Sequence, residues 1–428
     1  MALVVAKFGG TSVASPERIK MVAKRLVARK KQGDKVVAVV SAMGKTTDEL
    51  LGLAKSVCGD SLPPVREMDR LLSTGEQVSM SLVAMSIDAL GQKSMSFTGR
   101  QAGIKTDGAY AKAKIEEVAA DKILAAIEKD CIPVVAGFQG VDDEGNMTTL
   151  GRGGSDTTAV AIAWGINADV CEIYSDVDGV YTSDPRVCPR ARKLDYVNYD
   201  DMLELSSVGA GVLQMRAVEF ARKFNVTIHA RSAFTQDAGT FITKELKDME
   251  KAVITGIAHD TSEAKVTIRR VPDVTGVAAK LFMSLADSNV NTDMIIQNIS
   301  KDGYTDISFT CPEADLKRAK DTIDGILPSI SADTYDVDRD IAKVSVVGTG
   351  MKSSPGAAAL AFSTLNNNGI NILAISTSPI RLSVIVKIAQ AEIAVRELHT
   401  AYGLDSNSIF EEKQLSAEEI AAKKLKGR

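Results

Sequence analysis

The chain has 428 residues, of which 45% are hydrophobic and 25% charged, and a formal net charge of −4. A chain of this length predicts roughly two to four domains, and the weak negative charge provides no basic patch for nucleic acid. The five cysteines form no CxxC pair, which is typical of a reducing compartment. Because neither a signal peptide nor a run of about 18 apolar residues occurs, we expect a cytoplasmic protein with no membrane partner.

The sequence first predicts a buried strand over residues 3–8, followed by a glycine turn and a helix. The turn consists of Gly9, Gly10 and Thr11. Its glycines allow a sharp bend that presents backbone N–H groups to an anion, and the N-terminus of the helix beginning at Pro16 attracts phosphate. Lys7 beside the turn could neutralise a phosphoryl group during transfer. A structural turn with a solvated lysine explains this stretch equally well, and the pattern is neither a Walker loop nor a GxGxxG turn.

A second apolar strand, over residues 35–42, also ends in small and hydroxyl-bearing residues. Ligands of open α/β sheets bind at the carboxyl ends of the strands. Ser41 and Thr47 are therefore candidates for the same site as Lys7. The alternative is that Thr46 or Thr47 simply caps the following helix.

Three helices are expected next, over residues 48–58, over residues 65–72 and from residues 73–77 onward. The last of them opens with Glu76, which the helix dipole would favour as an ordinary first-turn carboxylate. The residue pattern alone assigns this glutamate no further role.

The most specific stretch runs from Thr148 to Thr158 and combines glycines, an arginine, hydroxyl groups and an aspartate before an apolar helix. Arg152 suits a bidentate grip on a carboxylate, while Ser155 and the glycine amides can face phosphate. An acidic substrate and a phosphate donor could therefore meet here. A glycine loop with Asp156 as the N-cap of the helix is the alternative, but it leaves Arg152 unexplained.

The strand predicted over residues 170–175 ends in a polar loop that suits a nucleotide pocket. Its candidate residues are Ser175, Asp176, Asp178, Tyr181, Asp184 and Arg186. The alternative is an acidic surface turn or a calcium loop, but the calcium-loop spacing with its final glutamate is absent. Alternating strands and helices up to about residue 245 predict one α/β sandwich with a mainly parallel sheet.

Residues 265–326 and 343–402 then repeat one order of elements, strand–helix–strand–strand–helix. Internal repeats of this kind are structural units that pack side by side. The three histidines are too dispersed for a metal site, so no metal ligand is expected in the chain itself. The charged, alanine-rich segment 416–428 is expected to be a frayed helix or a disordered tail.

Three motifs together resemble the aspartate kinases of the amino-acid kinase family, and the resemblance covers essentially the whole chain. They are KFGGTS at 7–12, GRGGSD at 151–156, and SDVDGVYT at 175–182 with DPR at 184–186. The resemblance implies an α/β fold, in which an αβα sandwich with a mainly parallel sheet precedes two ferredoxin-like (βαββαβ) ACT domains. The implied boundaries are 1–245 for the kinase domain, 262–335 for the first ACT domain, 250–261 plus 340–408 for the second, and 409–428 for the tail. A strand at 252–258 is implied to pair into the second ACT domain.

The resemblance further implies an enzyme that transfers the ATP γ-phosphoryl group, with Mg2+, to the β-carboxylate of L-aspartate. The product, 4-phospho-L-aspartate, leads toward lysine, threonine and methionine. Lys7 would stabilise charge on the phosphoryl group and Asp156 would orient Lys7. Arg152 would bind the α-carboxylate of the substrate and Glu76 its ammonium. Further substrate contacts would be Ser41 and Thr47. The implied ATP contacts are Lys7, Gly9, Gly10, Thr11, Ser155, Ser175, Asp176, Asp178, Tyr181, Asp184 and Arg186.

The sequence departs from the family pattern at three positions. Gly211 stands where members often carry a lysine, Thr275 where a proline usually precedes a glycine, and Pro379 where an acidic residue is usual. A kinase of glutamate or of a nucleoside monophosphate is a second hypothesis, against which the paired ACT modules argue. A ligand-binding regulator with an inactive kinase half is a third, opposed by the retention of Lys7 and Arg152.

ACT pairs of this family bind regulatory amino acids at their interface. The implied contacts are Asp273, Gly276, Asp293, Gln297 and Asn298 in the first module and Asn371, Ile375 and Ser376 in the second. Asp293 and Gln297 suit the ammonium and hydroxyl of threonine, whereas Pro379 removes a carboxylate and an N–H group that lysine could use. We expect inhibition by threonine, alone or with lysine, the alternative being a pair that only holds a dimer together. The partners expected are a second copy of the chain, or a shorter ACT-only product that begins near Met249.

Overall fold

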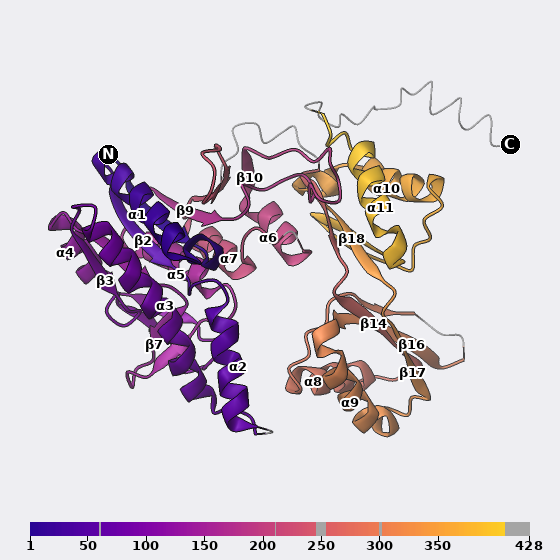
Figure 1. Cartoon of the computed structure of the whole chain (residues 1–428). Helices are drawn as coiled ribbons and strands as arrows, with labels where there is room; N and C mark the ends of the chain where they lie inside the picture. The colour runs from indigo at the N-terminus through magenta and orange to yellow at the C-terminus, as the bar shows by residue number, and fades with distance from the viewer. Residues whose placement is uncertain (60, 210, 245–253, 299–301, 407–428) are drawn as a thin grey trace. The chain divides into compact units, whose positions relative to one another are not determined.

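The computed structural model describes residues 1–59, 61–209, 211–244, 254–298 and 302–406, and these form two compact units (Figure 1). Residues 1–181 and 193–244 make the first unit, and residues 182–192 and 254–406 make the second. The expected tail at 409–428 lies outside the described residues. Within the described ranges, no helix has the length and apolarity needed to cross a bilayer.

The first unit is built on an eight-stranded sheet with the strand order β10-β12-β11-β9-β1-β2-β6-β3. The strands are β1 (Leu3–Phe8), β2 (Lys35–Val40), β3 (Ser94–Phe97), β6 (Ile132–Ala136), β9 (Val170–Ser175), β10 (Tyr196–Asn198), β11 (Ile228–Ser232) and β12 (Thr240–Thr243). All neighbouring pairs are parallel except β11 and β12. The central strands are continuous apolar runs because helices cover both of their faces. The predicted mainly parallel sandwich is therefore confirmed.

A smaller sheet of the first unit has the order β5-β4-β7-β8. Its strands are β4 (Ile104–Thr106), β5 (Ile115–Val118), β7 (Gln139–Val141) and β8 (Met147–Thr149). These strands are only three or four residues long, too short to show a clear alternation of apolar and polar residues. The sequence therefore did not predict this sheet.

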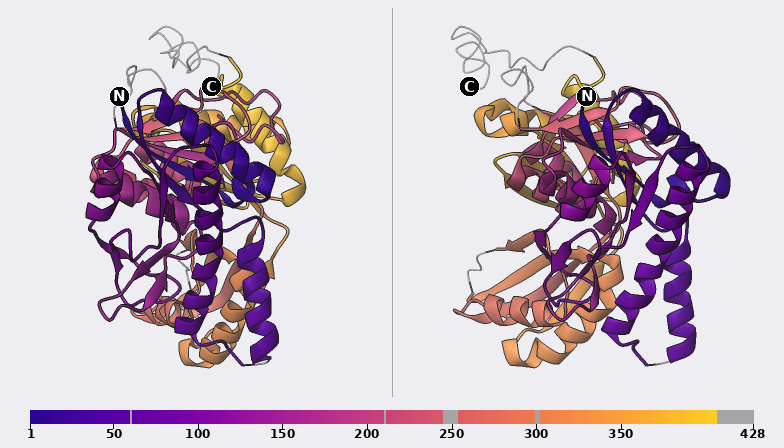
Figure 2. Two further views of the ribbon diagram at one scale, coloured as in Figure 1. Left: turned by 60° about the vertical axis from the view of Figure 1, so that its left-hand side comes forward. Right: turned by 90° about the vertical axis from the view of Figure 1, so that its left-hand side faces the viewer.

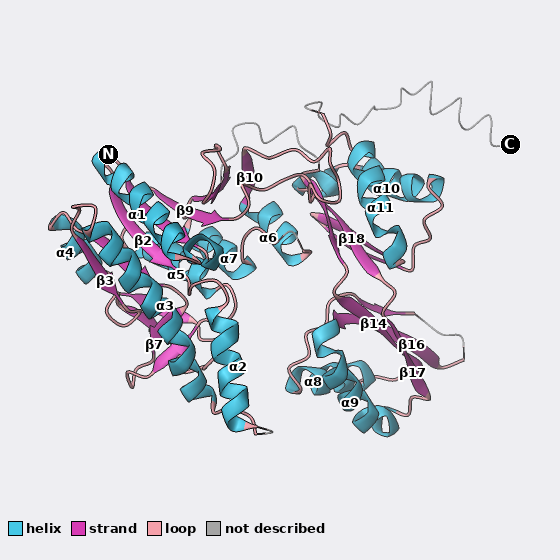
Figure 3. Cartoon of the chain, in the orientation of Figure 1, coloured by secondary structure: helices cyan, strands magenta, loops and turns pink. Residues whose placement is uncertain are grey.

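Helices of the first unit flank the large sheet (Figure 3). They are α1 (Pro16–Lys31), α2 (Thr46–Cys58), α3 (Val65–Asp88), α4 (Asp121–Glu128), α5 (Gly154–Gly165), α6 (Tyr199–Ser207) and α7 (Met215–Phe224), with a 3-10 turn, η1 (Gly10–Val13), after β1. Helix α1 begins as predicted, since Ser15 accepts a hydrogen bond from the Arg18 backbone N at 3.4 Å. Ala6 and Phe8 of β1 pack in one core with α1 and α3. Lys7, between them, consequently points to the opposite face.

Helix α3 is continuous over residues for which the sequence predicted a break. Ser73 and Thr74 do not start a new helix; their hydroxyls donate to the carbonyls of Arg70 and Leu71 within the helix. A Cβ at Gly75 would lie 2.9 Å from the Cβ of Ala42, so this glycine serves close packing rather than termination. In both views of Figure 2, α2 and α3 are long helices that lie side by side.

The second unit contains two four-stranded antiparallel sheets, each packed against two helices. The first module comprises β14 (Glu263–Pro272), α8 (Val277–Asp287), β15 (Ile295–Gln297), β16 (Tyr304–Pro312), α9 (Leu316–Ile326) and β17 (Thr334–Asp338). The second comprises β13 (Gly256–Asp260), β18 (Ala342–Val347), α10 (Pro355–Asn367), β19 (Ala374–Ser378), β20 (Arg381–Val386) and α11 (Ala391–Ala401). Strand β13 pairs antiparallel with β18. This confirms, for its described residues, that the strand preceding the first module completes the second.

Residues 182–192 leave the first unit and pack into the second module. Cys188 is 3% exposed and belongs to the same apolar core as β18 and α11. The Thr182 hydroxyl is 2.8 Å from His399 Nε2, and Arg192 Nε donates to the Leu404 carbonyl at 2.9 Å. From the sequence this segment was expected to be part of domain 1–245, because its polar residues gave no sign of a partner distant in the chain.

Candidate active site

The turns after β1 and β2 pack backbone to backbone at the carboxyl ends of the central strands. The Gly44 N–H donates to the Gly10 carbonyl at 3.1 Å, and a Cβ at Gly10 would lie 2.9 Å from the Ala42 carbonyl oxygen. Gly10 is therefore required for this close approach. The short turn η1 (Gly10–Val13) lies between β1 and α1, so the strand, the glycine turn and the helix beginning at Pro16 follow one another as predicted.

Lys7 at the end of β1 forms an ion pair with Asp156 in the first turn of α5. Their Nζ and Oδ1 atoms are 2.6 Å apart, and the two residues are only 8% and 7% exposed. The helix is preceded by Gly153, which has a left-handed φ of 74° and provides no side-chain cap. Asp156 is thus not the N-cap of α5; its carboxylate faces Lys7 instead.

Glu76 is 3% exposed and lies on α3 beside the turn after β2. Its Oε1 accepts a hydrogen bond from the Ala42 N–H at 3.1 Å, whereas its Oε2 is buried without a partner among the described residues. Burial of the carboxylate raises the pKa of Glu76 to about 7. This arrangement leaves a carboxylate oxygen available to a cationic ligand.

Ser41 precedes the residue whose N–H binds Glu76, and Thr47 lies in the helix that follows the same turn. Ser41 follows β2 and its carbonyl accepts a hydrogen bond from the Ser79 hydroxyl at 2.7 Å. Thr47 is half-buried in the first turn of α2, whose N-cap residue, Lys45, makes no side-chain cap. Thr46 donates to the Met43 carbonyl at 2.7 Å. Neither threonine is therefore the N-cap that the sequence offered as an alternative.

Arg152 lies in the glycine turn between β8 and α5. It is exposed and has no ion-pair or hydrogen-bond partner among the described residues. Gly151 and Gly153 on either side adopt left-handed φ values of 79° and 74°, which accounts for the glycines at these positions. Ser155 is buried at the start of α5, and a Cβ at Gly137 would lie 2.7 Å from the Ser155 Cβ. The turn thus presents the Arg152 guanidinium next to the tightly packed N-terminus of α5.

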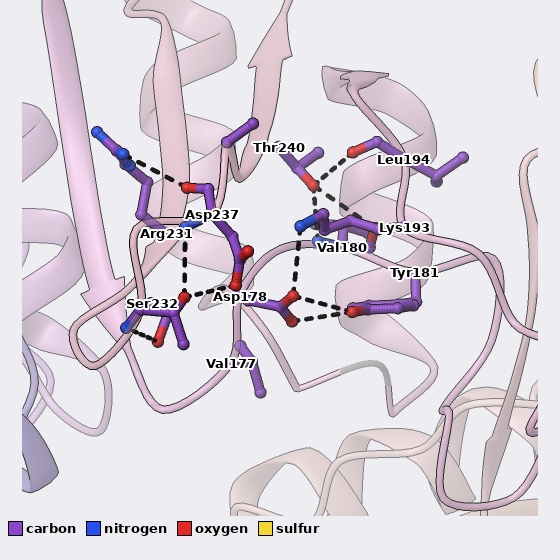
Figure 4. A network of polar contacts seen from close by, with 12 residues as sticks. Val177, Asp178, Val180, Tyr181, Lys193, Leu194, Arg231, Ser232, Asp237 and Thr240 are labelled. Carbon is purple, nitrogen blue, oxygen red and sulfur yellow. Dashed lines mark hydrogen bonds and ion pairs between the residues drawn. The ribbon is translucent and has the colours of Figure 1, made fainter.

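The loop after β9 is organised around Asp178 (Figure 4). The Tyr181 hydroxyl donates to both carboxylate oxygens of Asp178 at 3.0 Å, and Lys193 Nζ lies 3.3 Å from Oδ2. Burial and this carboxylate raise the pKa of Tyr181 to about 12. Thr240 accepts from the Val180 N–H and donates to the Leu194 carbonyl. Lys193 and Thr240 were not predicted, because no local motif in the sequence connects them to this loop.

The remaining nucleotide candidates are in two places. Ser175 accepts a hydrogen bond from the Val177 N–H at 3.3 Å, and Asp176 is exposed at the end of β9. Asp184 and Arg186 belong to the second unit, where they form an ion pair of 2.7 Å with each other. Only the part of the predicted nucleotide set up to Tyr181 therefore belongs to the first unit.

The first module of the second unit contains a cavity of about 320 Å³ between the end of β14 and the start of α8. Asp273, Gly276 and Gln297, three of the residues predicted to contact an effector, line it. Asn298 does not line it; its carbonyl accepts a hydrogen bond from the Thr305 hydroxyl.

Asp293 and the candidates of the second module lie elsewhere. Asp293 pairs with Lys343 at 2.7 Å, and this lysine is 2% exposed and also pairs with Glu263. Ile375, 45% exposed, and half-buried Ser376 lie on β19, an edge strand, and Asn371 is exposed before it. Within the described part of the chain, none of these lines the cavity of the first module.

Comparison with known proteins assigns the chain to a family. Residues 2–232 match the amino acid kinase family, and residues 269–325 and 344–402 each match an ACT domain. An aspartokinase of Mycolicibacterium smegmatis is 52% identical over 409 residues, covering 94% of this chain and 97% of that protein. The chain belongs to the aspartokinase family. An aspartokinase of Corynebacterium glutamicum is 50% identical over 94% of the chain and 97% of that protein.

Solved aspartokinases share the fold. E. coli aspartokinase III, crystallised with aspartate and ADP, matches with a TM-score of 0.77 at 23% identity, over 93% of this chain and 99% of that one. The aspartate kinase of Synechocystis matches with a TM-score of 0.53 at 38% identity, over 97% of this chain and 71% of that one. The chain is an ATP-dependent aspartate kinase with ACT regulatory domains, as predicted. The alternatives of another amino-acid kinase and of an inactive regulator are not supported.

Replacing Glu76 by glutamine should remove a pH dependence of stability. The pKa of this carboxyl group is about 7 in the folded chain against an ordinary value of 4.5, so the unfolded state loses the proton first as pH rises. Wild-type stability should therefore fall between pH 4.5 and 7, with a cost of about 3 kcal/mol fully present above pH 7. Glu76→Gln should be the more stable protein at pH 8 and should lack this slope, as measured by urea unfolding. Glu67→Gln, on the exposed side of α3, is the control, and parallel pH profiles for wild type and Glu76→Gln would contradict the assignment.

Proposed function

We propose that Lys7 is the cation that stabilises the phosphoryl group as it passes from ATP to the β-carboxylate of aspartate. The observation that carries this proposal is its buried ion pair with Asp156 at the carboxyl ends of the central strands. A buried lysine with a single carboxylate partner is held in one position, and a fixed cation can offset charge that develops in a transition state.

Arg152 and Glu76 are proposed to hold the two charged groups of aspartate that do not react. The exposed guanidinium of Arg152 has no partner in the part of the chain that the structure describes, which suits bidentate binding of the α-carboxylate. The buried Oε2 of Glu76 has no partner among the described residues, which suits the ammonium group. Ser41 and Thr47, from neighbouring turns, would complete the contacts. The site would then orient the β-carboxylate toward Lys7.

The reaction requires no general base. The attacking β-carboxylate is already an anion at neutral pH, so the enzyme needs only to align it with the γ-phosphorus and to offset charge repulsion. Attack forms the acyl–phosphate bond as the bond between the γ-phosphorus and its bridging oxygen breaks, and ADP leaves with that electron pair. Lys7 and the Gly10 N–H group are the proposed sources of stabilisation, since the Gly9 N–H donates to the Tyr174 carbonyl at 3.1 Å.

ATP is proposed to bind with its phosphates near Gly9, Gly10, Thr11 and Ser155, and with its nucleoside near the loop from Ser175 to Tyr181. Mg2+ is proposed to arrive with ATP, where it would neutralise phosphate charge. Among the described residues, no three histidine, cysteine, aspartate or glutamate side chains converge on one point. Mg2+ that binds with a nucleotide is usually held by one or two carboxylates together with the substrate phosphates. Exposed Asp176, directly after β9, is the carboxylate proposed for such a contact.

The proposed domains are 1–245 for the kinase, 262–335 for the first ACT domain and 250–261 plus 340–408 for the second. Residues 182–192 pack with the second ACT core although they interrupt the kinase sequence. The edge strands β15 and β19 carry exposed Ile295 and Ile375. These edges support a homo-oligomer, or an assembly with an ACT-only product, formed through the ACT domains.

The cavity of the first ACT domain is the proposed threonine site. Asp273 can accept hydrogen bonds from the effector's ammonium, and Gln297 can bind its hydroxyl or carboxylate. Asp293 already pairs with Lys343, so it would contribute to effector binding only by exchanging that partner.

Lys7→Ala should lower kcat by about a thousandfold, because it removes a fixed charge that acts on the transition state. The KM for aspartate should change far less, since Lys7 is not proposed to bind the unreactive groups of the substrate. A coupled ADP-release assay measures both constants. Lys20→Ala, on the exposed side of α1, is the matched control, and near-normal turnover by Lys7→Ala would disprove the assigned role.

Arg152→Ala should raise the KM for aspartate by roughly 10- to 100-fold, the range for losing a charge-assisted hydrogen-bonded pair. The KM for ATP should remain close to that of the wild type. The same assay with each substrate varied in turn separates the two effects. Arg100→Ala, another exposed arginine of the first unit, should leave both constants unchanged. An unaltered KM for aspartate in Arg152→Ala would exclude the proposed grip.

Threonine, alone or with lysine, should inhibit the full-length enzyme, and lysine alone should inhibit weakly. Gln297→Ala should raise the half-inhibitory concentration of threonine about tenfold by removing one hydrogen-bonding group. Asp287→Asn, at an exposed position at the end of α8, should leave this concentration unchanged. Calorimetric titration of the full chain with each amino acid measures binding directly. Tight binding of lysine with no threonine response would reverse the effector assignment, and binding of neither would favour a purely structural ACT pair.

A further inference from the structure

Asp69 of α3 is a buried carboxylate that the reaction described above does not use. It is 0% exposed. Its hydrogen-bond partners among the described residues are all neutral donors, namely two backbone N–H groups and one hydroxyl. A buried charge costs free energy unless donors converge on it, so the chain must provide these donors at fixed positions.

The three donors come from two segments that are distant in the sequence. The Ala111 N–H lies 3.0 Å from Oδ1 and 2.9 Å from Oδ2 of Asp69. The Thr149 N–H lies 2.7 Å from Oδ2, and the Thr149 hydroxyl lies 2.8 Å from Oδ1. A single carboxylate thus fastens β8 and the loop before β5 to α3.

These two segments support the turn that carries Arg152. A Cβ at Gly151 would lie 3.1 Å from the Ala111 carbonyl oxygen, so the turn rests directly on this loop. Ala111 itself has a left-handed φ of 66°, a conformation that alanine keeps only when its surroundings enforce it. The contact from Asp69 to the Ala111 N–H provides that constraint.

Arg216 of α7 holds the same two segments through their carbonyl groups. Its Nη1 donates to the Leu150 carbonyl at 2.7 Å, and its Nη2 donates to the Ala113 carbonyl at 2.6 Å. Asp69 binds N–H groups and Arg216 binds carbonyl groups, so between them they fix the base of the Arg152 turn.

Asp69 and Glu76 share one face of α3. They are seven residues apart, which corresponds to about two helical turns and roughly 10 Å along the axis. Both are almost completely buried. Helix α3 therefore carries Glu76, the proposed partner of the substrate ammonium, and also Asp69, which holds the segments that support the Arg152 turn.

We propose that Asp69 is a positioning residue for aspartate, which sets the distance between Arg152 and Glu76. The inference rests on the proposed function, in which these two residues bind the α-carboxylate and the ammonium. It requires no contact between Asp69 and the substrate. Its loss would let the Arg152 turn shift and would weaken aspartate binding without changing the groups that act on the phosphoryl.

The test is steady-state kinetics of Asp69→Asn, which keeps the shape of the side chain but places an amide NH2 against an N–H group. The KM for aspartate should rise roughly 10- to 100-fold, while kcat and the KM for ATP stay within about threefold of the wild type. Glu67→Gln, on the same helix and exposed, should match the wild type in all three constants. Equal changes in all constants of Asp69→Asn would indicate a purely structural role and overturn the proposal.

A double-mutant cycle with Arg152→Ala shows whether Asp69 acts through Arg152. The Asp69→Asn change should have little further effect on the KM for aspartate once Arg152 is gone. If the fold-change in the KM for aspartate of the double variant equalled the product of the two single fold-changes, the proposal would be overturned. If Arg152→Ala alone left this KM unchanged, the proposed carboxylate grip would fail instead, so the two failures are distinguishable.

Thr149 provides a milder change should Asp69→Asn fail to fold. Thr149→Val removes the hydroxyl donor and keeps the backbone donor, and should raise the KM for aspartate by a smaller factor than Asp69→Asn. Thr149→Ser restores a hydroxyl and should recover the wild-type value. A KM for aspartate that is the same in both Thr149 variants and the wild type would count against the proposal.

Discussion

The ion pair between Lys7 and Asp156 is the interaction on which the catalytic half of the molecule depends. It joins the end of the first strand to the first turn of α5, where the helix dipole favours the carboxylate. Neighbouring Phe8 points to the other face and stacks on Tyr174 at 4.8 Å. Because side chains alternate between the two faces of a strand, Lys7 lies on one face of β1 and Phe8 packs in the apolar core on the other. The packing of this core therefore sets the position of the Lys7 charge.

Hydrogen bonds of backbone groups position the turns around this pair. The turns after β1 and β2 meet through an N–H to carbonyl hydrogen bond, and the base of the Arg152 turn is held by Asp69 and Arg216 through main-chain atoms. Such contacts leave the Arg152 guanidinium and one Glu76 oxygen free of protein partners among the described residues. A site assembled in this way keeps its charged groups for ligands.

The sequence predicted those features that local pattern determines. A glycine turn after β1, small and hydroxyl-bearing residues after β2 and a polar loop after β9 indicated where these strands end. Arg152 stood out because a glycine loop with a helix cap leaves an arginine unexplained. Asp69 was missed because a single aspartate in an amphipathic helix has the same local pattern as a solvated one. The continuity of α3 was missed because Ser73, Thr74 and Gly75 are typical of helix ends, and only the contact with Ala42 explains the glycine.

The second ACT core includes a piece of chain that comes from within the kinase sequence. Val187, Cys188 and Ala191 pack in that core, and Thr182 provides the hydroxyl beside buried His399. A product translated from a start near Met249 would lack all of these residues. It would have to close an apolar gap and leave His399 Nε2 and the Leu404 carbonyl without the partners they have here. A regulatory chain that begins near Met249 would therefore lack part of the second ACT core, and a rearrangement or a segment from another subunit would have to fill that place.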